Sequence, residues 1–145
     1  MIWKHEAIEK LKQYGAKRLA LEDIPLEIKQ LEIGLQSIRS AGPDSSPVKG
    51  SSVSREDAML NNITYREELG ISHKQTQLWM KRMDKALGAL TADERLILER
   101  FYINPEKKAA DRLAGDLQVD IKTVYRRKDE ALRKFTMALY GVLET

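Results

Sequence analysis

The stretch Asp116-Leu-Gln-Val-Asp-Ile-Lys-Thr-Val-Tyr-Arg-Arg-Lys-Asp-Glu-Ala-Leu-Arg-Lys-Phe135 predicts the end of one short helix, a tight turn and the start of a second, cationic helix. Apolar residues in and just before it recur at spacings that give the two helices a shared underside: Leu113, Ala114, Leu117, Val119, Val124, Ala131 and Leu132. Basic side chains project from the other faces: Lys122, Arg126, Arg127 and Lys128. A helix with one apolar side and one basic side, entered from a three-residue turn, is typical of a helix-turn-helix that binds DNA.

The turn Gln118-Val-Asp120 has side chains suited to joining two helices at a steep angle. Ala114 is small enough to let the helices approach, and Val119 is expected to fill the turn. We expect Asp120 to accept backbone N–H bonds at the start of the second helix. Gln118 stands where glycine often takes a left-handed conformation, which costs glutamine about 1 kcal/mol. An ordinary helix pair with a solvated basic face is the alternative interpretation.

The rest of the chain predicts further helices, and the expected fold class is all-α. Ser54-Arg-Glu-Asp57 and Thr91-Ala-Asp-Glu94 have the pattern of capping boxes at helix starts. Residues 41–53 are rich in Gly, Pro and Ser and predict a flexible linker. The expected helices are 2–40, which either kinks or restarts near Ile24-Pro25 with Asp23 as a cap, then 54–89, 92–102, 106–117 and 121–143. The expected domains are 1–40, the linker 41–53, the long helix 54–89 and a helix-turn-helix domain 90–145.

Narrow apolar seams of coiled-coil type run along both long predicted helices. The first helix carries such residues at spacings of three and four: Ala7, Leu11, Tyr14, Arg18, Leu21, Ile24, Ile28, Leu31, Leu35 and Ile38. The second carries a more polar set: Met59, Asn62, Arg66, Leu69, His73, Thr76, Met80, Met83, Leu87 and Leu90. These seams predict an elongated antiparallel bundle that closes either within one chain or between two chains of a homodimer.

Composition and charge exclude several classes of function. The 145 residues carry a formal net charge of +3, which permits a nucleic-acid partner without demanding one. The absence of cysteine excludes disulfides, thiol nucleophiles and Cys-based zinc sites. No apolar run approaches the roughly 20 residues that cross a bilayer, and the N-terminus has no signal-peptide apolar block, so we expect a cytoplasmic protein without a membrane partner. His5 and His73 lie on different predicted helices, and no nucleophile or phosphate-binding motif is present, so we expect no enzyme, no metal and no cofactor.

Three segments carry a resemblance to a known family: Leu90-Thr-Ala-Asp-Glu-Arg-Leu-Ile-Leu-Glu-Arg-Phe-Tyr102, Leu113-Ala114 and Thr123-Val-Tyr-Arg-Arg-Lys-Asp-Glu-Ala-Leu-Arg-Lys-Phe135. They make residues 91–140 similar to region 4 of sigma-70-type factors. The layout of the whole chain resembles phage-encoded sigma-like regulators, the group that includes ArpU- and RinA-type late-gene activators and related phage proteins of unassigned function. Sigma regions 2 and 3 have no counterpart here, so the chain is not a complete sigma factor. The resemblance implies a regulator that binds double-stranded DNA in the host bacterial cytoplasm or nucleoid and acts with bacterial RNA polymerase.

The same resemblance implies which residues contact DNA. Base contacts would come from the start of the second helix of the motif: Ile121, Lys122, Tyr125 and Arg126. Lys122 and Arg126 are one turn apart, and each suits guanine O6 and N7 in the major groove. Ile121 stands where sigma factors commonly carry a polar residue, so we expect a DNA site unlike the standard sigma-factor element. Phosphate contacts are expected from Lys107, Lys108, Arg112, Thr123 and Arg127.

Two other functions stay open at the level of sequence. One is recognition of DNA for phage packaging, as in small-terminase proteins, which combine a helix-turn-helix with a ring-forming helical region. The other is a protein-interaction module that binds polymerase or an anti-sigma partner and no DNA.

Overall fold

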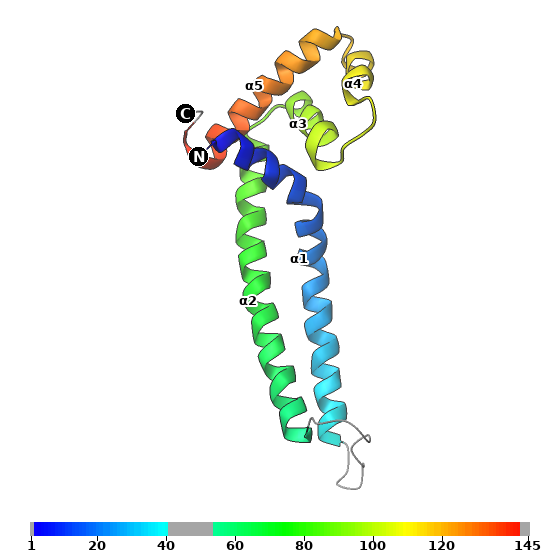
Figure 1. Cartoon of the computed structure of the whole chain (residues 1–145), viewed down its shortest axis with the longest axis vertical. Coiled ribbons are helices and arrows are strands. Elements are labelled where there is room, and N and C mark those ends of the chain that lie inside the picture. The colour runs from blue at the N-terminus through cyan, green and yellow to red at the C-terminus, as the bar shows by residue number, and fades with distance from the viewer. Residues whose placement is uncertain (1, 41–53, 143–145) are drawn as a thin grey trace. The chain divides into compact units, whose positions relative to one another are not determined.

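The computed structural model describes residues 2–40 and 54–142, and Figure 1 labels its helices. These residues form the helices α1 (Trp3–Ser40), α2 (Arg55–Gly88), α3 (Ala92–Leu98), α4 (Ala109–Leu117) and α5 (Ile121–Tyr140), with a π-helical turn, η1 (Glu99–Ile103). The expected all-α class is confirmed for this part of the chain. Across the same residues, no helix has the length and apolar character needed to span a membrane. The predicted linker, 41–53, lies outside the described residues.

The chain divides into two compact units. Unit 1 comprises Met1–Arg18 and Leu78–Thr145, and unit 2 comprises Leu19–Gln77. The expected segments 1–40 and 54–89 therefore each contribute to both units.

Unit 1 has two hydrophobic clusters. The larger one joins the first turns of α1 and the last turns of α2 to α3 and α5, and its buried members are Ala7, Leu11, Met83, Ala86, Leu87, Leu90, Leu98, Ala131, Leu132 and Phe135. The smaller one lies among α3, α4 and α5 and buries Ile97, Ala110, Leu113 and Val124. Ala114, Leu117 and Val119 pack against it, so the apolar underside predicted for the two C-terminal helices is confirmed.

Unit 2 is an antiparallel hairpin made of the second part of α1 and the first part of α2. Asn62 Nδ2 donates a hydrogen bond of 2.8 Å to the carbonyl oxygen of Leu31. Arg66 lies 3.8 Å from Glu32, and Arg55 Nε donates to the Ile38 carbonyl at 3.1 Å. The predicted seams therefore close within one chain along this hairpin. Packing is loose: most of its seam residues are half-buried, and Leu35 and Thr76 are buried.

The helix starts predicted from capping residues are confirmed. Ser54 Oγ accepts a hydrogen bond of 3.1 Å from the Asp57 backbone N–H at the start of α2. At the start of α3 the capping box is complete: Thr91 Oγ1 accepts from the Glu94 N–H, and Glu94 Oε1 accepts from the Thr91 N–H. Each cap satisfies backbone donors that the helix leaves unpaired.

One predicted helix break is absent. α1 continues without interruption through Pro25, so the proposal that a new helix starts near Pro25 with Asp23 as its cap is wrong. Seam residues on both sides of the proline, Leu21, Ile24 and Ile28, stay half-buried on one side of the helix. Packing along this seam offsets the backbone hydrogen bond that proline cannot make, as tertiary contacts often override local propensity.

Three other predicted boundaries also move. The helix expected at 92–102 ends as α-helix at Leu98 and continues as the π-turn η1, in which the Asn104 N–H donates to the Glu99 carbonyl at 2.8 Å. The helix expected from residue 106 begins at Ala109, because Lys108 has a left-handed backbone with φ of 56°. The helix expected to reach residue 143 ends at Tyr140, where Gly141 takes φ of 73° and caps it.

Candidate nucleic-acid interface

The connection between α4 and α5 is the three-residue turn Gln118-Val119-Asp120. Gln118 has φ of 56° and ψ of 46°, the left-handed conformation expected for that position. The Val119 N–H donates to the Ala114 carbonyl at 3.0 Å, which closes the end of α4. Asp120 Oδ1 accepts from the Thr123 N–H at 2.8 Å, as predicted for the cap of α5. Hydrogen bonds from Thr123 lower the pKa of Asp120, so the capping carboxylate stays ionised at neutral pH.

The first turns of α5 are held on their inner side by α3 and α4, as Figure 1 shows. Val124, Leu113 and Ile97 come from these three helices, and each is completely excluded from solvent. A fully buried contact among three helices gives α5 a defined orientation, because interiors at crystal-like density tolerate little displacement.

The outer side of the same turns carries all four residues predicted to contact bases. All four are exposed: Ile121, Lys122, Tyr125 and Arg126. Solvent reaches 45% of the surface of Ile121 and 46% of that of Tyr125. The structure therefore brings these four side chains together on one accessible stretch of helix. Arg126 Nη1 also donates to Glu130 Oε1 at 3.2 Å, so part of its charge is balanced by its own helix.

Tyr125 belongs to a small aromatic and cationic cluster that sequence reasoning missed. Its ring centroid lies 6.0 Å from that of Phe101 in η1. Lys128 Nζ lies 5.1 Å from the Tyr125 centroid and 5.2 Å from that of Phe101, within range for cation–π attraction. The contact between Tyr125 and Lys128 could have been predicted from the sequence, because the two residues are three positions apart on one helix. The approach of Phe101 could not, because it depends on η1.

The basic residues before and within α4, which were predicted to contact phosphates, have mixed surroundings. Lys107 and Lys108 are exposed in the turn that precedes α4. Arg112 pairs with Glu106 at 3.0 Å, and Arg100 contacts the same carboxylate at 3.1 Å and also binds Asp116. The hydrogen bond to Asp116 raises the pKa of Arg100. This network ties η1 to α4 and leaves Arg112 less available to an external anion than the two lysines.

The predicted phosphate contacts on α5, Thr123 and Arg127, are only half-exposed. Arg127 lines a hollow of about 230 Å³ together with Asp93, Glu94 and Lys134. Burial acts to raise the pKa of Glu94, but the hydrogen bond from the Thr91 N–H and the contact with Lys134 at 3.0 Å outweigh it, so the pKa is lowered. Arg127 therefore lies on the side of α5 that faces carboxylates, whereas Lys122 lies on the outer side.

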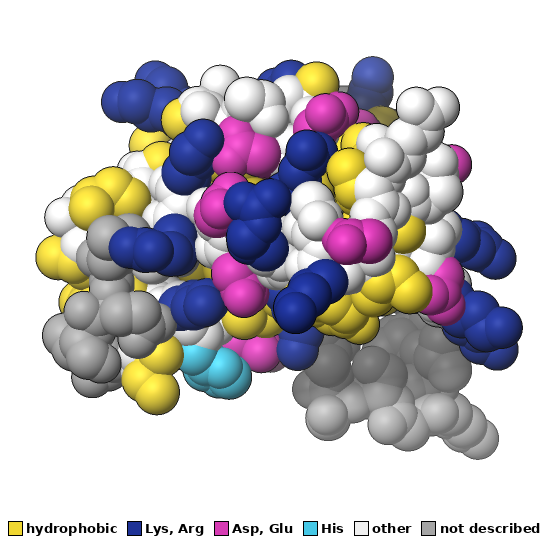
Figure 2. Space-filling view, turned by 90° about the horizontal axis from the view of Figure 1, so that it is seen from above, with side chains coloured by type: hydrophobic (Ala, Val, Ile, Leu, Met, Phe, Trp, Pro, Cys, Tyr) yellow, Lys and Arg dark blue, Asp and Glu magenta, His cyan; other side chains and the backbone are white. Residues whose placement is uncertain are grey.

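On one face of the molecule, side chains of both charges are interleaved (Figure 2). Figure 2 shows Lys and Arg side chains interleaved with Asp and Glu across the face seen from above. The two units nevertheless differ in total charge: unit 1 has 19 Lys and Arg against 13 Asp and Glu, a net +6, whereas unit 2 has 6 against 9, a net −3. Positive charge is thus concentrated in the unit that carries α4 and α5.

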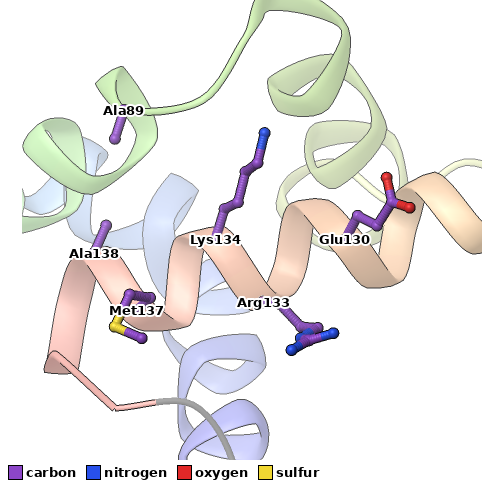
Figure 3. Close-up of a pocket in the computed structure, with 6 residues that line it drawn as sticks. All are labelled: Ala89, Glu130, Arg133, Lys134, Met137 and Ala138. Atoms are coloured by element: carbon purple, nitrogen blue, oxygen red, sulfur yellow. The ribbon is translucent and has the colours of Figure 1, made fainter.

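A separate hollow of about 590 Å³ lies along the later turns of α5. Figure 3 shows its lining residues, Ala89, Glu130, Arg133, Lys134, Met137 and Ala138, with Ala89 facing α5 from the connection between α2 and α3. None of the predicted base-contacting residues lines this hollow. It is therefore distinct from the exposed start of α5.

Comparison with protein-family models, with curated proteins and with solved structures gives no match. Within residues 2–40 and 54–142, no three His, Asp or Glu side chains gather as a metal site would require. A functional assignment for this chain therefore depends on the arrangement of α3, α4 and α5.

Proposed function

We propose that the protein is a sequence-specific regulator of transcription that binds double-stranded DNA. In this proposal α4, the turn and α5 act as a helix-turn-helix, and the first turns of α5 enter the major groove. The observation that carries it is the exposure of Lys122 and Arg126 on a helix whose opposite side is fixed by buried Val124. A groove-binding helix needs both an accessible cationic side and a rigid support.

Each contact has a distinct proposed task. Lys122 and Arg126 donate to guanine O6 and N7, while Ile121 touches a thymine methyl group. Lys107 and Lys108 bind phosphates and set the orientation of α5, because backbone contacts position a protein without identifying the sequence. The balance of charge over residues 121–134, six basic residues against Asp129 and Glu130, supports attraction to a polyanion.

The assignment to transcription, rather than to DNA binding in general, is supported by the resemblance of residues 91–140 to sigma region 4. On this basis we propose that the protein activates phage or prophage late genes together with bacterial RNA polymerase. Mixed charge over the surface seen in Figure 2 suits contact with a protein partner beside the DNA.

The test is fluorescence anisotropy with duplexes selected from random oligonucleotides, repeated over a series of salt concentrations. We expect the logarithm of the affinity to fall linearly with the logarithm of salt, with a slope of about −0.9 for each phosphate neutralised. Arg126→Ala should relax sequence preference, whereas Lys107→Ala should weaken binding to every duplex equally. Binding that ignores salt, or no binding at all, would contradict the proposal, and identical behaviour of the two variants would contradict the assignment of tasks.

DNA recognition for packaging is the second candidate, and one observation favours it. The hairpin of unit 2 keeps large apolar side chains exposed on the outer sides of both of its helices, including Leu26 and Ile71. Such faces suit an assembly of several copies. Transcription of a reporter distinguishes the candidates, since a protein that changes transcription from its selected DNA site supports regulation, whereas one that binds the site without changing transcription supports packaging.

Binding to polymerase or an anti-sigma partner without DNA is the third candidate. It is favoured by the intramolecular pairing of Arg126 with Glu130 and of Arg112 with Glu106, which reduces the charge free to meet phosphates. Retention of polymerase from nuclease-treated extract, combined with no DNA binding by the pure protein, would select it.

A further inference from the structure

The outer sides of the unit 2 hairpin carry regularly spaced apolar residues in solvent. On α1, Leu19, Leu26 and Ile33 are 69%, 62% and 57% exposed. They are seven residues apart, the spacing that keeps side chains on one stripe of a helix. On α2, Leu60 and Ile71 are 61% and 60% exposed, and their spacing of eleven residues also keeps them on one side.

These stripes lie opposite the seam that holds the hairpin together. At 3.6 residues per turn, Leu26 points about half a turn away from Ile24 and Ile28, which lie in the seam. Ile71 is placed in the same way relative to Leu69 and His73. The hairpin therefore has one apolar stripe on its inner side and another along the outer edge of each helix. The inner stripe is covered, and the two outer stripes are not.

The two outer stripes also overlap in height. Asn62 bonds to Leu31, and Arg66 lies against Glu32, which fixes the antiparallel register of the hairpin. In that register Leu26 and Ile33, which are about 10 Å apart along α1, lie between the levels of Ile71 and Leu60, which are about 16 Å apart along α2. A neighbouring copy placed beside the hairpin at the same height would therefore bring apolar residues of α2 opposite apolar residues of α1.

Charges beside the stripes are complementary at the same levels. Glu22 and Asp23 flank the α1 stripe on its two sides, at the level of Lys74 on α2. Lys29 flanks the α1 stripe at the level where Glu67 and Glu68 flank the α2 stripe on its two sides. At the level of each lysine, the opposing stripe has an acidic residue on both of its sides. Each lysine therefore faces a negative charge whichever way the two helices cross. Such flanking pairs set partner and orientation in helical assemblies.

The α1 stripe also has space for a partner side chain. A hollow of about 420 Å³ lies on this face, lined by Leu19, Ala20, Glu22, Asp23 and Leu26. The small side chain of Ala20 forms a depression beside two leucines. An apolar side chain inserted there would be surrounded by side chains from one helix, as a knob is in a coiled-coil hole.

We propose that these faces join copies of this chain head to tail, with the outer face of α2 on one copy packed antiparallel on the outer face of α1 on the next. Ile71 then packs on Leu26 of the neighbouring copy, and Leu60 packs on Ile33. Each copy in such a pair keeps one unused face, so the contact is heterologous and continues until a ring closes. This proposal does not depend on DNA binding, because none of these residues belongs to the candidate interface.

Sedimentation of the full chain without DNA tests the proposal with two variants, Leu26→Asp and Ile71→Asp. Each places a charge in one of the two faces, so each pure variant loses every contact, and we expect association to weaken by at least about 100-fold. An equimolar mixture contains one intact face of each kind. It should therefore form a dimer of one Leu26→Asp chain and one Ile71→Asp chain, and nothing larger.

Tyr65→Asp is the matched control, because Tyr65 is a 46% exposed apolar residue of α2 that lies to the side of the stripe. This variant should assemble as the wild type does, and far-UV circular dichroism should show equal helix content in all variants. A wild-type chain that stays monomeric at high concentration overturns the proposal. So does self-association of either pure variant, or a mixture that contains only monomers.

The flanking charges give a second, independent readout. Lys74→Glu should weaken assembly, because it places like charges opposite each other. The same chain with Glu22→Lys and Asp23→Lys added should assemble again, because the charges on both faces of every contact are then reversed. Loss of assembly in both variants would overturn the proposed register. DNA affinity measured on a short duplex that binds one copy should be unchanged throughout, which separates this proposal from the proposed function.

Discussion

Individual residues at the two ends of α4 have an unusual backbone. Lys108 and Gln118 are the non-glycine residues with positive φ among those described, and both have φ of 56°. L-residues avoid this region because Cβ approaches the following carbonyl oxygen, at a cost of roughly 1–2 kcal/mol. Short turns on both sides of α4 bring Leu113 into contact with Val124, and this packing offsets the backbone strain at both positions.

The strain at the turn gives a prediction for stability. Gln118→Gly should raise the free energy of unfolding by a net amount of about 0.5–1 kcal/mol. Glycine has no Cβ and so removes the clash in the folded state. The greater entropy that glycine gives the unfolded chain offsets part of this gain. Gln118→Ala is the control and should not stabilise, because it keeps a Cβ. Urea denaturation measures both. An unstable Gln118→Gly variant would mean that the glutamine side chain has a role outside the turn geometry.

A single carboxylate at the start of α5 gives a prediction for pH. The folded-state pKa of Asp120 is lowered, so the unfolded state binds more protons than the folded state as the solution becomes acidic. Its stabilising contribution is present above the unfolded pKa of about 3.9 and is lost as pH falls through the folded value. Asp120→Asn keeps a cap but does not titrate, so its melting temperature should fall less than that of the wild type between about pH 5 and pH 3. Equal falls in melting temperature for Asp120→Asn and the wild type would show that the Asp120 carboxylate does not contribute to the pH dependence of stability.

At the scale of helices, the two sides of α5 have different surroundings. Its inner side, with Val124 and Phe135 fully buried, holds unit 1 together. Its outer side carries the candidate DNA contacts, among them the exposed side chains of Lys122 and Arg126. Stability and DNA binding should therefore respond to different substitutions.

A pair of variants tests that separation. Leu113→Ala removes a completely buried side chain beneath α5 and should cost about 2–5 kcal/mol of unfolding free energy. Lys122→Ala changes an exposed side chain and should stay within about 0.5 kcal/mol of the wild type, yet lower DNA affinity. Thermal denaturation and anisotropy on the same samples provide the comparison. A Lys122→Ala variant that unfolds easily would assign Lys122 to the structure of unit 1 instead.

The ion pair within α5 gives another prediction at this scale. Arg126 and Glu130 are 3.2 Å apart and both largely exposed, so their pairing contributes little to stability. Glu130→Gln should release Arg126 and remove a negative charge near the duplex, and DNA affinity should rise while the melting temperature stays nearly constant. Asp111→Asn is a control for charge alone, since Asp111 lies on α4 and is exposed. Equal gains from both variants would show that net charge, rather than release of Arg126, is responsible.

For the whole molecule, the main feature is the opposite net charge of its two units. A net charge of +6 on unit 1 would attract a polyanion and −3 on unit 2 would repel it, which supports the proposal that DNA binds to unit 1 through α4 and α5. The same division assigns separate proposed tasks: unit 1 binds DNA, and unit 2 joins copies of the chain. Assembly would then place several DNA-binding surfaces in one particle and raise the effective affinity for long duplexes.

The charge division predicts where a lost cation matters. Arg39→Ala in unit 2 should change DNA affinity less than about twofold, whereas Lys107→Ala in unit 1 should lower it for all sequences and reduce the salt slope by about 0.9. Both substitutions remove one exposed positive charge, so net charge is matched between them. Equal losses would show that DNA responds to total charge and not to its position.

Features that act over a few residues were predictable from the sequence. The caps at Ser54, Thr91 and Asp120 and the left-handed position of Gln118 were expected and are confirmed. Each depends on a side chain and a backbone group at most one or two turns apart, or on a spacing that a helix converts directly into a face. The exposure of Lys122 and Arg126 followed from the same periodicity.

Other features depend on residues that are distant in sequence, and only the folded arrangement decides them. Pro25 stays within α1, where the seam residues Leu21, Ile24 and Ile28 are half-buried on both sides of it. Phe101 meets Tyr125 and Lys128, and Arg100 binds Asp116, because η1 turns the chain toward α4 and α5. The periodicity of Leu26 and Ile71 was in the sequence, but their exposure and relative height depend on which sides of α1 and α2 face each other. Local hydrogen bonds and helical spacing are encoded within a few residues, whereas burial and ion pairing are set by whichever surfaces the fold brings into contact.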